Sequence, residues 1–188
     1  IGNTVLYGAT SGRLYASGKA GEIEIRYNSN GVEWREDLFE LWSHFKLVRY
    51  HYSIDAVGAR NHYIRWPNDW VRAQEAFRQL DEETTNNVEV TIACAVNALN
   101  IYYVPEFIQW KMEQGFRKIN MWPFGAGGIN YHFVYWPPHL NVKILPEWFK
   151  DKVQERYEEF YPWWEKNWEL GVPSWHKGKV EYDTWRQA

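Results

Sequence analysis

The spacing of apolar residues along the chain switches repeatedly between the strand period and the helix period. Alternation over residues 23–27 predicts a strand that ends at the turn-forming residues 28–31. Apolar residues over 38–45 recur at helical spacing, and residues 47–54 read as a second strand. A loop is expected next, over the stretch that holds Gly58, Asn61 and Pro67.

The same order continues in the middle of the chain. Asp69 can cap a helix over 70–80. Residues 88–96 are β-branched and almost continuously apolar, as expected for a strand buried on both faces. A helix that opens at Pro105 and stops at Gly115, followed by a fourth short strand over 119–122, completes this region. Three successive strand–helix units predict a parallel α/β fold, either a doubly wound sheet or a barrel.

The two ends of the chain have a different pattern. Glycines separate short apolar pieces over residues 1–21, which predicts short strands rather than helices. After a glycine-rich loop, two more strands are expected over 129–135 and 140–145, and Pro146 opens a long helix that reaches Trp164 or beyond. We therefore divide the chain into a glycine-rich segment, 1–21, a βα region, 22–122, and a C-terminal region, 123–188.

Composition and charge narrow the class of protein. The 188 residues are enough for one domain with a sizeable core. A net charge of −3 does not favour binding to the negatively charged backbone of a nucleic acid, and no apolar run has membrane-spanning length. Neither a nucleic acid nor a membrane is therefore expected as a partner. The single cysteine, Cys94, cannot form an internal disulfide and favours a cytoplasmic location. A first residue of Ile1 rather than Met suggests a truncated reading frame or a trimmed chain.

Motifs at two strand ends carry a family resemblance. The first strand ends in Tyr27-Asn28-Ser29-Asn30-Gly31, and the second in Tyr52-Ser53-Ile54-Asp55-Ala56-Val57-Gly58, with Arg65 shortly after. With these motifs the chain, over about residues 22–168, resembles the radical S-adenosylmethionine (SAM) superfamily, in the branch with a shortened "twitch" extension. Ser29 and Ala56 stand where the family usually has Thr and Gly.

The resemblance implies a fold and a missing part. The implied fold is α/β: half of a TIM-like parallel barrel over 22–122, followed by a short α+β extension. Members of that family hold a [4Fe–4S] cluster on a CxxxCxxC motif, reduce SAM with it and release a 5′-deoxyadenosyl radical. This chain has one cysteine and lacks that motif, whereas such clusters need several thiolates. We therefore expect a fragment of a radical SAM enzyme that forms part of the SAM and substrate cavity wall.

The resemblance also implies partners and binding residues. The fragment alone should be inactive and hold neither SAM nor the cluster stably, and the parent enzyme would use an electron donor and a small-molecule or peptide substrate. The implied cofactor-binding residues follow three strands: Ser29, Asn30, Ser53, Asp55, Arg65 and Asn97. Asn and Ser can bond ribose hydroxyls, and Arg can grip a carboxylate in bidentate fashion. We expect Asn30, Ser53, Asp55 and Arg65 to converge on one edge of a parallel sheet.

Plainer interpretations stand beside these assignments. Asp55 can cap a loop with Arg65 as its ion-pair partner, and Asn97 with Asn100 can serve turn chemistry. His51, within a strand, is expected to be structural, and the histidines show no zinc-binding spacing. Cys94 is expected to be a small core residue. Trp163 and Trp164 are expected to pack on a sheet rather than to form a stacking platform.

Two other identities remain open at this stage. The first 21 residues resemble the glycine-rich β-helix domain of the glutamate synthase large subunit, around Gly2-Asn3-Thr4-Val5-Leu6-Tyr7-Gly8. They are therefore interpreted as a segment foreign to the rest, and a stray piece of glutamate synthase is one alternative for the chain. With 13 Trp and 13 Tyr, a non-enzymatic aromatic-rich binding module is the other.

Overall fold

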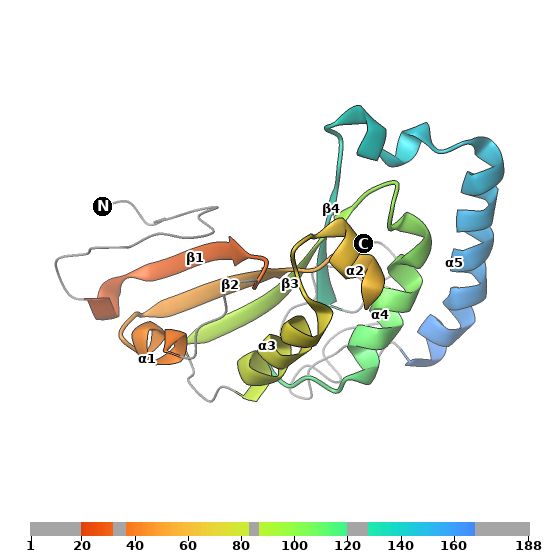
Figure 1. The fold of residues 1–188 in the computed structure, drawn as a ribbon. Helices are drawn as coiled ribbons and strands as arrows, with labels where there is room; N and C mark the ends of the chain where they lie inside the picture. Colours follow the sequence, from red (N-terminus) through yellow and green to blue (C-terminus); the bar gives the residue numbers. More distant parts are fainter. Residues whose placement is uncertain (1–19, 32–36, 83–86, 120–127, 168–188) are drawn as a thin grey trace.

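The computed structural model describes residues 20–31, 37–82, 87–119 and 128–167. Its centre is a sheet of four strands in the order β1-β2-β3-β4, in which every neighbouring pair is parallel (Figure 1). The strands are β1 (Glu24–Ser29), β2 (Leu47–Ser53), β3 (Val88–Val96) and β4 (Ile129–Phe133). The sheet is open, because β1 and β4 do not pair with each other.

At least one helix follows each strand along the chain. In the described residues the helices are α1 (Leu38–Ser43), α2 (Ala59–Ile64), α3 (Trp70–Glu82), α4 (Val104–Glu113) and α5 (Glu147–Asn167). Short 3₁₀ segments are η1 (Ala20–Glu22), η2 (Ile101–Tyr103), η4 (Pro138–Leu140) and η5 (Val142–Ile144). The α/β class with parallel strand–helix units predicted from the sequence is thus confirmed.

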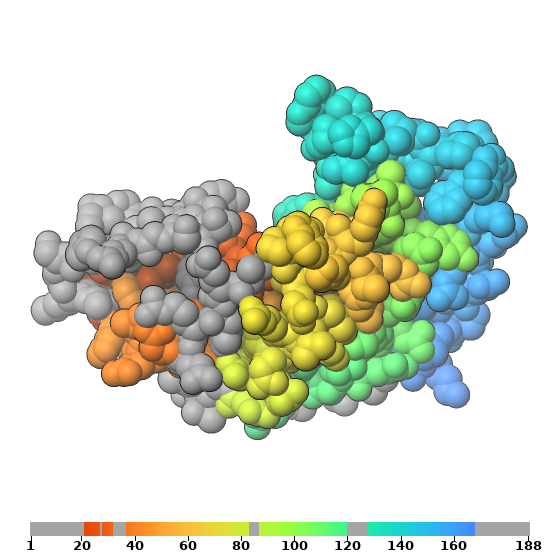
Figure 2. Space-filling view, viewed as in Figure 1, coloured from red at the N-terminus to blue at the C-terminus, as the bar shows by residue number. Residues whose placement is uncertain are grey.

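One face of the sheet carries the hydrophobic core. Burial alternates along β2 and β3, so Val48, Tyr50 and Tyr52 point to the same side as Ile92 and the other even-numbered residues of β3. Side chains of α1, α3, α4 and α5 belong to the core on this side. Figure 2 shows α3 and α4 lying in front of the sheet in the same view as Figure 1. We call this side of the sheet the covered face and the opposite side the open face.

Strand order and helix placement are the features in which the two predicted architectures differ. A doubly wound sheet reverses its strand order and carries helices on both faces. The described strands follow chain order, and the described helices that pack on the sheet lie on its covered face. The described residues thus show neither the reversal of strand order nor the second helical layer of a complete doubly wound sheet, and their sheet is not closed into a barrel.

Helix α3 shows how local sequence sets these elements. Asp69 Oδ1 accepts hydrogen bonds from the N–H groups of Val71 and Arg72, at 2.8 and 3.1 Å, as predicted for an N-cap. Its next turns bury one stripe, formed by Ala73, Ala76, Phe77 and Leu80. This stripe packs on the aromatic residues of the sheet, with the Phe77 and Tyr52 ring centroids 4.7 Å apart.

Three sequence predictions were wrong, and a fourth can be compared with the structure at one residue only. Strand β3 is buried on one face only, since every second residue is half-buried. Residues 140–145 form 3₁₀ segments rather than a strand, because Pro137 and Pro138 precede them and Asn141 caps η5.

The loop expected around Asn61 holds the short helix α2. Strand β4 begins at Ile129, whereas Ile119 lies in a turn; the rest of the strand predicted over 119–122 falls outside the described residues.

The sheet and its core continue past residue 122. Strand β4 pairs with β3, and Tyr157, Phe160, Trp163 and Trp164 of α5 pack against the same core, as predicted for the two tryptophans. Residues 1–19, which carry the predicted glycine-rich segment, lie outside the described residues. Within the described helices, none combines the length and apolarity that a bilayer crossing requires.

Candidate functional site

An ion pair marks the carboxyl edge of the sheet. Asp55 lies two residues beyond β2 and is 4 % exposed, while Arg65 follows α2 and is 22 % exposed. Arg65 Nη2 donates to Asp55 Oδ1 at 3.0 Å, and Arg65 Nε lies 2.7 Å from Oδ2 without hydrogen-bond geometry. The N–H of Ala95 in β3 also donates to Asp55 Oδ1, at 2.7 Å. The carboxylate therefore ties β2 to β3 and to the segment after α2.

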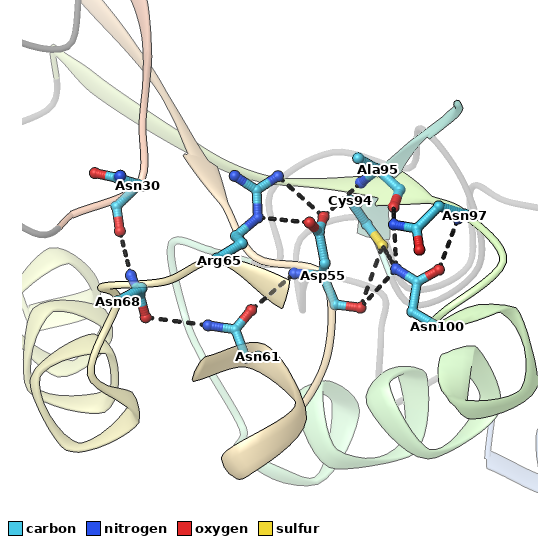
Figure 3. Close-up of polar contacts among 9 residues, drawn as sticks. All are labelled: Asn30, Asp55, Asn61, Arg65, Asn68, Cys94, Ala95, Asn97 and Asn100. Atoms are coloured by element: carbon cyan, nitrogen blue, oxygen red, sulfur yellow. Dashed lines mark hydrogen bonds and ion pairs between the residues drawn. The ribbon is translucent and has the colours of Figure 1, made fainter. Parts of the chain in front are cut away.

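Asparagine side chains extend this network toward β1 (Figure 3). The N–H of Asp55 donates to Asn61 Oδ1 at 3.0 Å, and Asn61 Nδ2 donates to Asn68 Oδ1 at 3.0 Å. Asn68 Nδ2 in turn donates to the carbonyl of Asn30, just past β1. Asn61 and Asn68 are fully buried, where an amide that lost its partners would destabilise the fold. These two residues thus hold the ends of β1 and β2 together.

A second pair of asparagines shapes the end of β3. Asn100 Nδ2 donates to the carbonyls of Asp55 and Ala95, at 2.9 and 3.0 Å, and Asn100 Oδ1 accepts from the N–H of Asn97 at 2.8 Å. Asn97 bonds the carbonyl of Ala95 and the N–H of Leu99, each at 2.9 Å. Both amides are buried and engaged with the chain itself, which agrees with the turn chemistry considered from the sequence.

Beside the ion pair, a hollow of about 270 Å³ lies on the open face. Backbone and Cβ atoms of β3 residues 93–95 help to form it, and Arg65 lines its edge. Six polar side chains from three strands also line it: Arg26, Asn28, His51, Ser53, Asn130 and His132. Within the described part of the chain, none of these six side chains forms a hydrogen bond or an ion pair, although His51 Nδ1 is buried.

The structure separates the residues that the sequence singled out. Asn30, Ser53, Asp55 and Arg65 lie together at the carboxyl edge of parallel strands, as predicted, and the Asp55–Arg65 pair takes the form of the plainer interpretation. Ser53 and Arg65 reach the hollow. Ser29 is placed differently: its Oγ accepts from the N–H of Gly31 at 3.1 Å and interacts with Tyr50 on the covered face.

The alternation of side chains along a strand would have identified some of the hollow-lining residues that were not predicted from the sequence. In a strand every second side chain points the same way. Given Ser53 on the open face, His51 follows from alternation within β2, and Asn28 follows from its register opposite His51. His51 had been expected to be structural. Asn130 and His132 could be added only once β4 was known to lie beside β3.

The electrostatics of the hollow centre on His51. Burial lowers the pKa of its imidazole, and the positive charges of Arg26, His132 and Arg49 lower it further, against a smaller opposing effect of Glu89. The imidazole is therefore biased toward its neutral form. A neutral histidine with a buried ring nitrogen that has no partner within the described chain is suited to hydrogen-bond a ligand.

The iron–sulfur group of the resembled family does not fit this chain. Cys94 is its only cysteine, and the side chain is fully buried on the covered face. Burial raises the pKa of the thiol far above its usual range, whereas a cluster ligand must be a thiolate. Cys94 is the core residue expected from the sequence.

Neither the protein-family models nor the curated protein sequences that were compared with this chain gave a match.

Proposed function

We propose that this chain forms the ligand-cavity wall of a radical SAM-type α/β barrel, with the open face turned toward the inside of the barrel. In such a barrel the helices lie outside, the strands follow one another in chain order, and ligands lie at the carboxyl ends of the strands. The described sheet has this strand order and a single helical layer. The observation that carries the proposal is the set of polar side chains on the open face that have no partners in the described chain.

The chemistry of these side chains suits SAM. Ser53 and Asn28 could bond the ribose hydroxyls, and a guanidinium could bind the carboxylate of the methionine part. When bound to a cluster elsewhere in the parent enzyme, SAM would supply a 5′-deoxyadenosyl radical. This chain would contribute binding and orientation of that ligand and of the substrate, and it would be inactive alone.

The gene upstream of the Ile1 codon tests the proposal. We expect an in-frame CxxxCxxC motif within one domain length. The longer product, reconstituted anaerobically, should then contain iron and sulfide, and the 188-residue chain prepared in parallel should not. A start codon close to Ile1 with no cysteine motif before it, or a stoichiometric cluster on the short chain, would overturn the proposal.

Exposed aromatic side chains favour a second candidate, the aromatic-rich binding module. Tyr63 and Trp66 are 75 % and 74 % exposed, and Tyr135 and Trp136 are 71 % and 80 % exposed. Aromatic faces at this exposure can stack on sugars or bases. Tryptophan fluorescence in Trp66→Ala and Trp136→Ala distinguishes the two functions: a saccharide or nucleoside that quenches only the unsubstituted protein supports the module.

A further inference from the structure

The charged residues of the open face do not balance one another. Among the described residues, three acids belong to this face, and each is engaged by a cation: Asp55 by Arg65, Glu89 by Arg49 at 2.9 Å, and Glu24 by Lys46 at 3.0 Å. Arg26 lies on the same face of β1 as Glu24, is exposed, and forms no ion pair with any described residue. In the part of the chain that the structure describes, the cation Arg26 at the hollow is therefore not matched by an acid of its own.

Two histidines line the same hollow as that cation. His51 lies within electrostatic reach of both Arg26 and His132, because the charges of these two residues act on it. His51 Nδ1 is buried and has no hydrogen-bond partner in the described residues. A buried polar atom without a partner in a folded protein needs an explanation, and a ligand atom is one.

We infer that Arg26 and His51 form a binding site for an oxyanion, the phosphate or carboxylate group of a ligand held in the hollow that His132 also lines. The Arg26 guanidinium supplies positive charge and several N–H donors, and the imidazole of His51 supplies a ring N–H donor, a combination that suits an oxyanion. Asn28 and Asn130 add amide donors on either side. The site opens along the sheet from the Asp55–Arg65 pair, so a ligand could place a neutral part near Ser53 and its anionic group near Arg26.

This inference rests on the proposed function in one respect, that the open face forms the wall of a ligand cavity. It adds the chemical class of the ligand, which carries a phosphate or carboxylate group. A bound anion would stabilise the protonated imidazoles and so raise the pKa of His51, which burial and its cationic neighbours lower. The histidine signals therefore report on the site directly.

The test is an NMR titration of the histidine Cε1–H signals of the 188-residue chain with inorganic phosphate. Ionic strength is held constant with sodium chloride, because a change in ionic strength alters the interactions between surface charges and so shifts histidine pKa values without any binding. We expect saturable shifts of the His51 and His132 signals and a higher pKa of His51 in phosphate. A parallel titration with acetate separates the two ligand groups: saturation by both supports a general oxyanion site, and saturation by phosphate alone supports a phosphate site.

Matched variants locate the effect. Arg26→Gln should weaken phosphate binding about tenfold or more, the factor expected for loss of a charged hydrogen bond. Arg72→Gln removes an exposed arginine of α3, in the helical layer, and should leave binding unchanged. Both variants should keep the wild-type amide spectrum, since both arginines are exposed.

Several outcomes would overturn the inference. These are shifts that grow linearly with phosphate, shifts equal to those in sodium chloride, or equal binding by the Arg26→Gln and unsubstituted chains. The two proposals can fail separately. The absence of an upstream cysteine motif would contradict the radical SAM proposal but not the oxyanion site. A phosphate titration without saturable shifts would contradict the oxyanion site but not the radical SAM proposal.

Discussion

The two faces of the sheet differ in burial and polarity, although the same strands form both. On the covered face, aromatic and aliphatic side chains of β2 and β3 are almost completely buried against four helices. On the open face, polar and charged side chains alternate with them and line a hollow, where six have no partner in the described chain. One residue step along a strand thus separates groups that stabilise the fold from groups available to a ligand.

Neighbouring residues of β3 test this contrast most strongly. Ile92 is fully buried on the covered face, and Thr91 is half-buried on the open face. Ile92→Ala should lower the free energy of unfolding by about 2–5 kcal/mol, from lost burial and a cavity. Thr91→Ala should change it by less than about 1 kcal/mol. Urea unfolding of both variants measures the difference; equal losses would show that the open face is also packed.

The Asp55–Arg65 ion pair at the sheet edge is expected to have the next largest effect on the free energy of unfolding. Arg65→Gln leaves the buried carboxylate of Asp55 without its cation and should cost about 3 kcal/mol. Asp55→Asn should cost less, because its amide oxygen can still accept from Ala95 while Arg65, 22 % exposed, can reach water. Thermal unfolding of the two variants gives the order. A larger loss in Asp55→Asn would mean that Arg65, not Asp55, has no alternative partner.

Gly31 tests how closely the end of β1 approaches the covered face. Its φ is +66°, and a methyl group there would overlap the ring of Tyr52. Gly31→Ala should therefore cost about 2–4 kcal/mol, from backbone strain and overpacking together. Gly115→Ala is the control, because Gly115 also has φ +66° but no atom near its Cβ position. It should cost about 1 kcal/mol, and equal losses would rule out a packing role for Gly31.

Lys111 places a titratable group in the core behind the covered face. Its side chain is fully buried in α4, and burial lowers its pKa to about 7, with Asp81 acting in the opposite direction. Between that value and the unfolded pKa near 10.4, the unfolded chain binds a proton that the folded chain does not. Stability should therefore rise with pH in this window, by up to about 1.4 kcal/mol per unit.

The Lys111→Met variant isolates that effect. Other groups titrate identically in both proteins, so the difference between their free energies of unfolding should change with pH only through Lys111. Chemical unfolding at pH 7, 8 and 9 measures it. A constant difference across this range would mean that Lys111 remains charged in the folded state.

How far the sequence predicted this molecule depended on how local each signal is. The strand and helix periods over β2, α3 and α5 were read correctly, because each is set by residues within one element, as with the Asp69 cap. The one-sided burial of β3 was not, because its open-face residues Ala93 and Ala95 are small and apolar and hide the alternation. Helix α2 was missed because its Gly58 and Pro67 flanks resemble a loop.

The site was predicted in outline only. Motif positions identified the carboxyl edge and the Asp55–Arg65 pair, since both follow strand ends in sequence. They could not say which face each side chain takes, and the structure places Ser29 on the covered face, away from the hollow. Arg26 and His132 carry no motif at all; only the pairing of four strands brings them to one hollow.

The central claim is that the open face binds a ligand, whereas the buried asparagine network beside it only supports the fold. Side-chain amide NMR signals distinguish them during a titration with S-adenosylhomocysteine, a stable analogue of SAM. The account predicts weak but saturable shifts for Asn28 and Asn130, which line the hollow, and none for Asn61 and Asn100, whose amides are engaged internally. No saturable shift at the two open-face residues, or equal shifts at all four, would contradict it.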